Sequence, residues 1–259
     1  MNNSELENIA KNLIETTDLA GKKSIEIYKK GLKIITKPDN SPVSNGDLEV
    51  NKILTEKIKS LTPNIPIISE ETVDLKKENT LKTFWLIDPI DGTKEYIAGK
   101  DEYTINAALV LNYMPTIGLL GVPKKDRLFY SYGKNNSFMI EGKKTTKLDC
   151  KKKTTKGKIF AVSGAEKPSP LILDVLKKHK VETFTPMHSS YKFCVIATGE
   201  FDFYAAKERA NEWDYAAGHA VAENAGAIIT TLDNEPFKYG KNDYKNLSLI
   251  IKRNEVLDA

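Results

Sequence analysis

At residues 85–93 the chain reads Trp85-Leu86-Ile87-Asp88-Pro89-Ile90-Asp91-Gly92-Thr93, and this segment combines a predicted buried strand with two candidate functional acids. Its first residues continue an apolar run, 84–87, that is typical of a strand buried on both faces. The run is expected to stop abruptly at Asp88, where a proline and then a glycine favour a sharp turn. Two carboxylates, those of Asp88 and Asp91, therefore follow a buried strand. Open α/β sheets bind their ligands at such strand ends.

The two acids allow two interpretations. Carboxylate and carbonyl oxygens that converge at a strand end suit Mg²⁺ or Mn²⁺, which are hard cations that prefer oxygen ligands. The backbone N–H groups of Gly92 and Thr93 would also face a phosphate if they open a helical turn. The alternative is a capped turn with two surface acids, and the spacing alone does not decide between them.

Acidic residues outside this segment favour the metal interpretation. Glu70 follows a predicted short strand, 65–68, and Asp214 begins a predicted helix, 214–225. Asp214 in isolation would be interpreted as an N-cap. Acids at the ends of separate elements, however, fit a cage for two divalent ions, and the four candidates are Glu70, Asp88, Asp91 and Asp214.

The composition excludes several classes of protein. The chain has 259 residues, of which 40% are hydrophobic, so it can fill a core. Its 39 basic and 35 acidic residues give a net charge of only +4, which does not indicate a nucleic-acid coat. Two cysteines, Cys150 and Cys194, suit a reducing compartment.

Membrane and targeting signals are not found. Residues 1–7 lack the basic-then-apolar order of a secretory signal, and no apolar run approaches the roughly 20 residues of a membrane-spanning helix. We therefore expect a cytoplasmic protein without an integral membrane segment. A peripheral association with the inner membrane through its lysines stays open.

The order of predicted helices and strands is mixed, which favours an α+β or layered α/β fold over a (β/α)8 barrel. A lysine-rich stretch, 143–158, is expected to be an exposed boundary. We accordingly expect an N-terminal α+β half, 1–150, that carries most of the metal site. A C-terminal α/β half, 151–259, would contribute Asp214 and substrate contacts.

Two motifs resemble the paired signature of the inositol monophosphatase superfamily: Asp88-Pro89-Ile90-Asp91-Gly92-Thr93 and Trp213-Asp214-Tyr215-Ala216-Ala217-Gly218. The resemblance covers nearly the whole chain. It implies a layered αβαβα sandwich and a Mg²⁺-dependent, lithium-sensitive phosphatase. Within the superfamily, the residues at 39–47, 92–96 and 189–194 are most similar to bacterial-type 3′(2′),5′-bisphosphate nucleotidases. Those enzymes convert adenosine 3′,5′-bisphosphate to AMP and phosphate, and so clear a by-product of sulfate assimilation.

The resemblance also implies roles for the acids. Glu70, Asp88 and Asp91 would bind a first Mg²⁺, while Asp88, Asp91 and Asp214 would share further metal. The backbone carbonyl of Ile90 matches another ligand. The expected cofactor is two or three Mg²⁺ ions, with Mn²⁺ as an alternative. Paired cations can lower the pKa of a bound water and neutralise the leaving oxygen.

The catalytic pair is implied in the same way. Thr93 matches the hydroxyl that holds the attacking water, and Asp47 matches the carboxylate that accepts the proton through Thr93. Without the resemblance, Asp47 would be interpreted as an N-cap of the predicted helix 48–61.

The substrate contacts that the resemblance implies are Gly92, Thr93, Ser163, Lys192 and Asp214. Lys192 would supply the cation that a second phosphate needs outside the metal cage.

The chain departs from the nucleotidase pattern at two positions. Glu166 stands where an arginine or histidine usually follows the serine, and His188 stands where a glycine is usual. Lys207 and Arg209 could compensate for the missing charge.

Other functions stay open at this point. The same site could act on inositol 1-phosphate or fructose 1,6-bisphosphate, and the sulfated nucleotide could also be accepted. A protein of another class would be a non-catalytic nucleotide or metal binder on the same fold. The lysines around Lys153 and Lys156 could touch nucleic acid, but a solvated loop is the commoner meaning. We expect a small phosphorylated nucleotide as partner and no nucleic acid, and a homodimer is compatible with the sequence.

Overall fold

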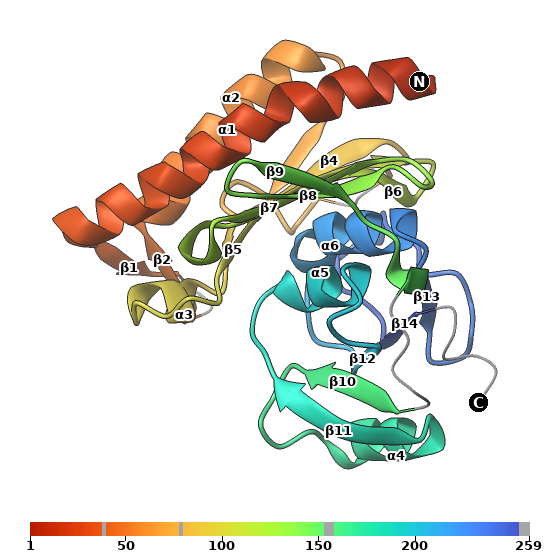
Figure 1. The fold of residues 1–259 in the computed structure, drawn as a ribbon. Helices are drawn as coiled ribbons and strands as arrows, with labels where there is room; N and C mark the ends of the chain where they lie inside the picture. Colours follow the sequence, from red (N-terminus) through yellow and green to blue (C-terminus); the bar gives the residue numbers. More distant parts are fainter. Residues whose placement is uncertain (38–39, 78–79, 153–157, 254–259) are drawn as a thin grey trace.

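The structure is a computed structural model that describes residues 1–37, 40–77, 80–152 and 158–253 (Figure 1). Asp39, Lys153 and Lys156, which the sequence interpretation used, lie outside the described residues. The helices are α1 (Asn3–Lys30), α2 (Asn45–Leu61), α3 (Thr93–Ile97), α4 (Pro170–Lys178), α5 (Tyr191–Ala197) and α6 (Glu212–Asn224). Two short 3₁₀ turns lie at Pro123–Lys125 and Cys150–Lys152.

A seven-stranded sheet has the order β3-β4-β5-β6-β7-β8-β9 and is antiparallel except for the β3–β4 pair. Its strands are β3 (Ile67–Ser69), β4 (Phe84–Asp91), β5 (Thr104–Leu111), β6 (Met114–Val122), β7 (Arg127–Tyr132), β8 (Ser137–Glu141) and β9 (Lys144–Lys147). A separate hairpin pairs β1 (Ile34–Thr36) with β2 (Pro42–Ser44).

The second sheet has five strands in the order β11-β10-β12-β14-β13. The strands β10 (Ile159–Ser163), β11 (Val181–Pro186) and β12 (Phe203–Ala206) run parallel to one another. The strand β14 (Leu249–Lys252) is antiparallel to both β12 and β13 (Ile228–Thr231).

The elements stack in five layers (Figure 1). Helices α1 and α2 cover one face of the seven-stranded sheet, and α5 and α6 lie between the two sheets. Helix α4 packs on the outer face of the five-stranded sheet, against β11 and β12. The layered αβαβα sandwich expected from the sequence is confirmed.

The apolar run at the start of β4 is buried on both faces, as predicted. Trp85 and Ile87 pack in the core under α1 and α2, whereas Phe84 and Leu86 pack in the core that α5 and α6 share. Since successive strand residues point to opposite faces, a strand between two helical layers needs an unbroken apolar sequence. The run therefore identifies a central strand.

The end of β4 corrects one expectation. The strand does not stop at Asp88 but continues to Asp91, with Asp88 opposite Asn106 and Asp91 opposite Thr104 on β5. Between these two pairs, β4 has two residues where β5 has only one, so the pairing is irregular here. Pro89 lies in this irregular stretch, and a proline cannot donate to the strand ladder. Both carboxylates consequently belong to the last residues of β4 rather than to a loop after the strand.

A second expectation is also corrected. The stretch 143–158 is not simply an exposed boundary, because it contains β9 and a 3₁₀ turn whose Cys150 is fully buried. All strands of the seven-stranded sheet precede residue 150, and all strands of the five-stranded sheet follow it. Helix α6 also follows residue 150, but it packs on β4, β5 and β6 of the seven-stranded sheet. The division into 1–150 and 151–259 therefore stays a prediction, while α6 carries Asp214 to the end of β4.

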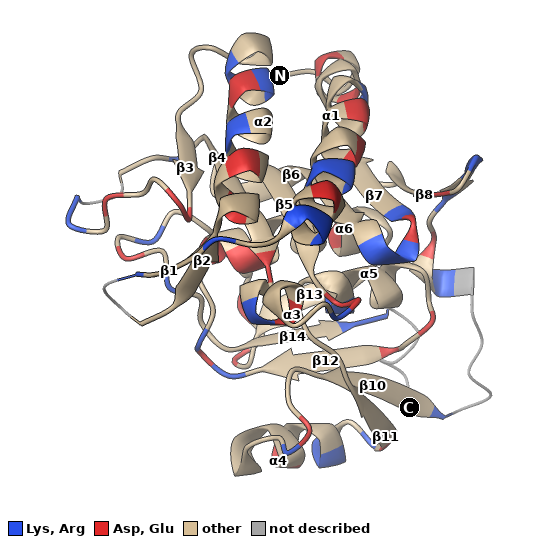
Figure 2. Cartoon of the chain, turned by 90° about the vertical axis from the view of Figure 1, so that its left-hand side faces the viewer, with Lys and Arg blue, Asp and Glu red and all other residues tan. Residues whose placement is uncertain are grey.

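Basic and acidic residues are interspersed along α1 and α2 (Figure 2). The 39 basic and 35 acidic residues of the whole chain leave a net charge of only +4. None of the helices in the described parts of the chain is long and apolar enough to cross a bilayer.

Candidate active site

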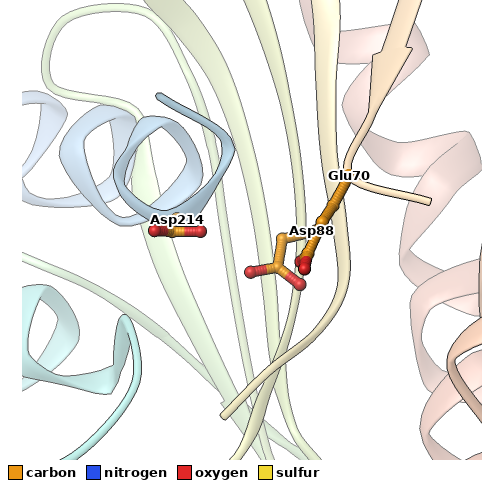
Figure 3. Close-up of side chains that lie close together, drawn as sticks. All are labelled: Glu70, Asp88 and Asp214. Carbon is orange, nitrogen blue, oxygen red and sulfur yellow. The ribbon is translucent and has the colours of Figure 1, made fainter. Parts of the chain in front are cut away.

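Three carboxylates from three elements meet at the end of β4. Glu70 follows β3, Asp88 lies in β4, and Asp214 lies in the first turn of α6. One oxygen of each lies within 4.8 Å of the others, and Figure 3 shows the three side chains pointing toward one another. Among the described residues, these three acids form a group whose oxygens are close enough together to hold a metal ion. Three of the four predicted acids are therefore brought together.

Backbone pairing and helix capping fix the two outer acids. Glu70 is held because its N–H donates to the carbonyl of Ile87, at 3.1 Å, which extends the β3–β4 pairing. Asp214 is the third residue of α6, and its Oδ2 accepts from the N–H of Asn211, at 2.8 Å, in a capping box. The N-cap is thus Asn211 rather than Asp214. The carboxylate of Asp214 therefore takes part in the capping box and also lies in the cluster.

The cluster fits a divalent cation. Asp88 is 1% exposed, and its Oδ1 has no hydrogen-bond partner in the described structure. Burial raises the pKa of Asp88 well above its usual value, and the nearby charges of Glu70 and Asp91 raise it further. The pKa of Asp214 is raised for the same reasons, burial first and then Asp91. A cation would supply the missing charge, and an all-oxygen donor set suits Mg²⁺ or Mn²⁺.

Asp91, the fourth predicted acid, lies beside the cluster but has other partners. Its Oδ2 accepts from the backbone N–H of Ser190, at 2.5 Å, and from Thr104 Oγ1, at 3.4 Å. Ser190 also donates its hydroxyl to the carbonyl of Asp214. Ser190 therefore ties α5 to both β4 and α6, a positioning role that the sequence interpretation missed. A metal-binding role for Asp91 stays a prediction.

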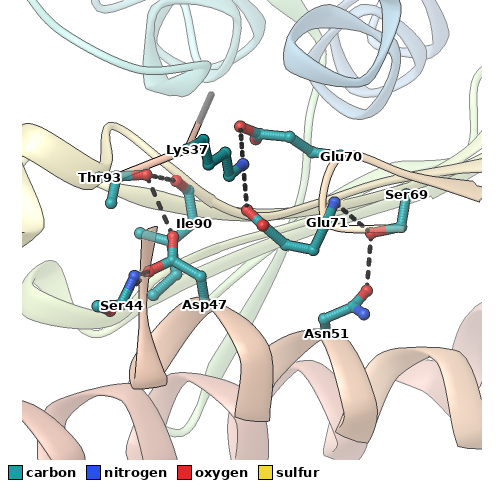
Figure 4. A network of polar contacts seen from close by, with 9 residues as sticks. All are labelled: Lys37, Ser44, Asp47, Asn51, Ser69, Glu70, Glu71, Ile90 and Thr93. Carbon is teal, nitrogen blue, oxygen red and sulfur yellow. Dashed lines mark hydrogen bonds and ion pairs between the residues drawn. The ribbon is translucent and has the colours of Figure 1, made fainter. Parts of the chain in front are cut away.

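The predicted catalytic pair is in contact (Figure 4). Thr93 Oγ1 lies 3.1 Å from Asp47 Oδ1 and 3.1 Å from the carbonyl oxygen of Ile90, and it can donate to either. The other oxygen of Asp47 accepts from the N–H and hydroxyl of Ser44, at 2.8 and 2.6 Å. Burial raises the pKa of Asp47 above its usual value, although these hydrogen bonds oppose the shift. The hydrogen bonds from Ser44 therefore hold the carboxylate in place, with its Oδ1 facing the threonine hydroxyl.

The turn at Gly92 brings this pair together. Gly92 has φ 92°, a left-handed conformation that a side chain would strain, and Thr93 begins the short helix α3 directly after it. The carbonyl oxygen of Ile90, a predicted metal ligand, faces Thr93 Oγ1, and a carbonyl oxygen has two lone pairs, so this contact uses only one of them.

Lys37 was not predicted. It follows β1, and its Nζ lies 3.0 Å from Glu70 Oε1 and 2.9 Å from Glu71 Oε1 (Figure 4). Burial raises the pKa of Glu71 to about 7, although the ion pair with Lys37 opposes the shift. Because 33 residues separate Lys37 from Glu70, no local pattern indicates this contact. The ammonium group neutralises part of the negative charge beside the cluster.

A pocket of about 350 Å³ opens next to the acids. Three of the predicted substrate contacts, Ser163, Lys192 and Asp214, line it together with Asp91. The ammonium of Lys192 donates to the carbonyl of Ser189 and lies 5.5 Å from the centre of the Tyr204 ring. Gly92 and Thr93 are not among the lining residues of this pocket, and they lie on the side of Asp47 instead.

Glu166 and His188, the two departures from the nucleotidase pattern, lie in different parts of the structure. Glu166 is exposed and is not among the residues that line the pocket. His188 faces α3, with its backbone N–H bonded to Glu102, at 2.9 Å, and its ring Nδ1 3.6 Å from Glu95 Oε1. Of the residues suggested as compensation, both Lys207 and Arg209 line the pocket.

Known proteins resemble this chain along most of its length. The model of the inositol monophosphatase family matches residues 4–258. The 3′(2′),5′-bisphosphate nucleotidase CysQ of Escherichia coli O6:H1 is 31% identical over 223 residues, which cover 85% of this chain and 89% of that protein. The chain therefore belongs to the inositol monophosphatase family and is a phosphatase.

Solved structures show the same fold. CysQ from Bacteroides thetaiotaomicron has a TM-score of 0.77 and 30% identity, and the match covers 94% of this chain and 96% of that one. An IMPase/NADP phosphatase that was solved with Mg²⁺ and phosphate has a TM-score of 0.78 over 98% of this chain and 96% of that one. At 18% identity this second likeness supports the fold alone.

Proposed function

We propose that this phosphatase removes the 3′-phosphate of adenosine 3′,5′-bisphosphate and releases AMP and phosphate. The observation that carries the proposal is the position of the Asp47–Thr93 pair beside the cluster of Glu70, Asp88 and Asp214. A general base next to an oxygen-rich metal cage suits hydrolysis of a phosphomonoester by water. Relatives that are named 3′(2′),5′-bisphosphate nucleotidase CysQ support the choice of substrate.

The residues of the chain divide the work between them. Glu70, Asp88 and Asp214 would hold Mg²⁺, with Asp91 and the carbonyl of Ile90 as further ligands. When bound, Mg²⁺ lowers the pKa of a coordinated water and neutralises charge on the phosphoryl oxygens. We propose two or three ions at this cage, with Mn²⁺ as a substitute and with inhibition by Li⁺.

On the catalytic side, Thr93 orients the attacking water with its hydroxyl. Asp47 takes up the proton that is passed through Thr93, since its Oδ1 faces that hydroxyl. The two hydrogen bonds from Ser44 keep the other oxygen of Asp47 occupied, so that the carboxylate cannot rotate away. On the substrate side, Ser163 and Lys192 contact the nucleotide from across the pocket.

A comparison of substrates tests the proposal. Phosphate release with Mg²⁺ is measured from adenosine 3′,5′-bisphosphate, the corresponding sulfated nucleotide, inositol 1-phosphate and fructose 1,6-bisphosphate. We expect the highest kcat/KM on adenosine 3′,5′-bisphosphate. A higher value on inositol 1-phosphate or on the sugar bisphosphate would overturn the choice of substrate while leaving the chemistry intact.

The metal assignment of Asp91 has its own test. Asp91→Asn removes one charge from the cage and should abolish phosphate release. Asp233→Asn removes the same charge at an exposed site outside the cluster and should leave the rate unchanged. Activity that survives Asp91→Asn would show that Asp91 is only a partner of Ser190.

A further inference from the structure

Tyr96 anchors the short helix α3, which begins at Thr93. Of the five residues of α3, all of which the structure describes, Tyr96 alone is buried, at 1% exposure. It lies three residues after Thr93, so the two side chains share one face of the helix. A helix of five residues is not stable by itself, and its position depends on contacts with the rest of the protein. The contacts of Tyr96 therefore determine where α3 holds Thr93.

The ring of Tyr96 lies directly on Gly46, the residue before Asp47. A Cβ atom at Gly46 would come within 2.6 Å of Tyr96 Oη, 2.8 Å of Cε1 and 3.0 Å of Cζ. Gly46 is the second residue of α2 and is not among the glycines with positive φ, so its backbone conformation does not require glycine. Alanine would also favour the helix more. The close approach of the ring is thus the physical reason for a glycine here.

The phenol of Tyr96 fixes the depth of the ring. Its Oη donates to the backbone carbonyl of Ser24 in α1, at 2.6 Å. The ring also packs against those of Tyr28 and Tyr103, with centroids 5.8 and 4.9 Å away. Burial raises the pKa of Tyr96 above its usual value, so the phenol keeps its proton and stays a donor. A shift of the ring away from Gly46 would strain this hydrogen bond.

We propose that Tyr96 and Gly46 are positioning residues that set the distance between Thr93 Oγ1 and Asp47 Oδ1. This inference rests on the proposed roles of Thr93 and Asp47 in the hydrolysis. The contact between the ring and the glycine fixes how closely α3 approaches the start of α2, and the 3.1 Å between the two oxygens depends on that approach. A displacement of about 1 Å between reacting groups can lower a rate by roughly 100-fold.

Gly46→Ala tests the contact. The added methyl group would push the ring and α3 away from α2, so we expect kcat to fall by about 10- to 100-fold, with KM within about twofold of the wild type. The acids of the metal cluster are not touched, and Mg²⁺ should therefore raise the melting temperature as it does in the wild type. The substrate is the phosphate ester that the wild-type enzyme hydrolyses fastest, so the test does not depend on which nucleotide that is.

The double variant Gly46→Ala/Tyr96→Phe separates positioning from general damage. It removes Oη, the atom that lies nearest to the added Cβ, and frees the ring from the carbonyl of Ser24, so the ring can move aside. Tyr96→Phe alone should lower kcat only a few-fold. We expect kcat of the double variant to recover to near that value. Two substitutions that merely loosened the fold would add, and the double variant would then be the slowest of the three.

The controls change similar groups at other contacts. Tyr103→Phe removes a buried hydroxyl that lies 2.8 Å from Ser24 Oγ, in the same aromatic cluster. Gly21→Ala adds a methyl group to a helical glycine of α1 that lies against Pro123. Both should keep the wild-type kcat. Rates are compared at a temperature where thermal melting shows every variant to be folded. If Gly46→Ala does not fold, Tyr96→Leu tests the same contact by removing the ring, and its kcat should fall without a change in KM.

The outcomes separate this inference from the proposed function. A wild-type kcat in Gly46→Ala or in Tyr96→Leu, a double variant slower than both single ones, or an equal loss in the controls would overturn the positioning role. In the Thr93→Ala background, Gly46→Ala should lower kcat little further, because it acts through that hydroxyl, and full additivity would also overturn the role. A wild-type kcat in Thr93→Ala itself would overturn the proposed catalytic pair and this inference together.

Discussion

Thr93 Oγ1 lies 3.1 Å from Asp47 Oδ1, although 46 residues separate them in the chain. Asp47 is the third residue of α2, where it also forms a capping box with Ser44. One carboxylate therefore serves two purposes, because one of its oxygens caps a helix and the other faces a candidate catalytic hydroxyl. A loss of activity on mutation has to be separated from a loss of helix stability.

Thr93→Ala and Asp47→Asn should each lower kcat by roughly 10²- to 10⁴-fold, with little change in KM, because the water loses its base. The double variant should lose little more than either single one, since the pair acts as a unit. Ser44→Ala is the control that removes the cap but keeps the pair. It should cost about 1 kcal/mol of stability and only a few-fold in rate. A Ser44→Ala enzyme as slow as Thr93→Ala would mean that the pair acts through the helix.

Asp88→Asn should stabilise the metal-free protein while it abolishes stabilisation by Mg²⁺. The wild-type carboxylate is buried among Glu70, Asp91 and Asp214, and its Oδ1 has no partner. A neutral amide relieves this repulsion, by roughly 1–3 kcal/mol, and can donate to the remaining acids. Thermal melting is measured in chelator and in excess Mg²⁺, which should raise the melting temperature of the wild type only. Equal stabilisation of both proteins by Mg²⁺ would place the ion elsewhere.

The stability of the metal-free protein should fall as the pH rises between 4.5 and 7. Burial raises the pKa of Glu71 from 4.5 to about 7, despite the ion pair with Lys37. In that range the folded state keeps a proton that the unfolded state has released, so that each rise in pH favours unfolding. Urea unfolding in chelator measures the slope, and Glu71→Gln should reduce it. A slope that Glu71→Gln leaves unchanged would assign the effect to other groups.

Affinity for the anionic substrate should weaken above pH 8. Burial lowers the pKa of Lys192 to about 8, against the effect of Asp91, so that its positive charge is lost as the pH rises through this value. KM for adenosine 3′,5′-bisphosphate should therefore increase between pH 7 and 9. In Lys192→Gln the KM should be high already at pH 7 and should not rise further. A parallel rise in both enzymes would exclude Lys192 as its source.

The sequence predicts the fold of this chain well wherever a pattern is local. The continuous apolar run of β4 correctly indicated a strand between two helical layers, and the predicted helix 214–225 overlaps almost all of α6, Glu212–Asn224. The strands β8, β9 and β11 were not predicted. β9 reads Lys144-Thr145-Thr146-Lys147 and is largely exposed, so it carries no apolar signal. Exposed edge strands depend on their neighbours for their structure.

Prediction of the candidate site from the sequence is likewise limited to residues that belong to a local pattern. Acids that follow strands or open a helix predicted the carboxylate cluster, whereas the pair of Asp47 and Thr93 was implied only by the resemblance to the inositol monophosphatase superfamily. Lys37 and Ser190 were missed as partners of Glu70 and Asp91, since these contacts join segments 33 and 99 residues apart. Only the packing of the layers brings such residues together.

Arg253→Met should destabilise the protein strongly without touching the active site. The fully buried Arg253 donates to Asp202 Oδ1 from Nε, at 2.6 Å, and to the carbonyl of Cys150 from Nη1, at 3.0 Å. Its loss leaves the buried carboxylate of Asp202 without its cation, at a cost of about 3–5 kcal/mol. Urea unfolding measures this cost, and the activity of the folded fraction should be retained.

The double variant Asp202→Asn/Arg253→Met provides the control for that ion pair. It removes both charges, while the amide oxygen can still accept from the N–H of Phe160, which now donates to Asp202 Oδ2 at 2.9 Å. We therefore expect the double variant to be more stable than Arg253→Met alone, since no buried charge is left unpaired. If the double variant were less stable than Arg253→Met, the arginine would contribute through packing and its bond to Cys150 rather than through the charge of Asp202.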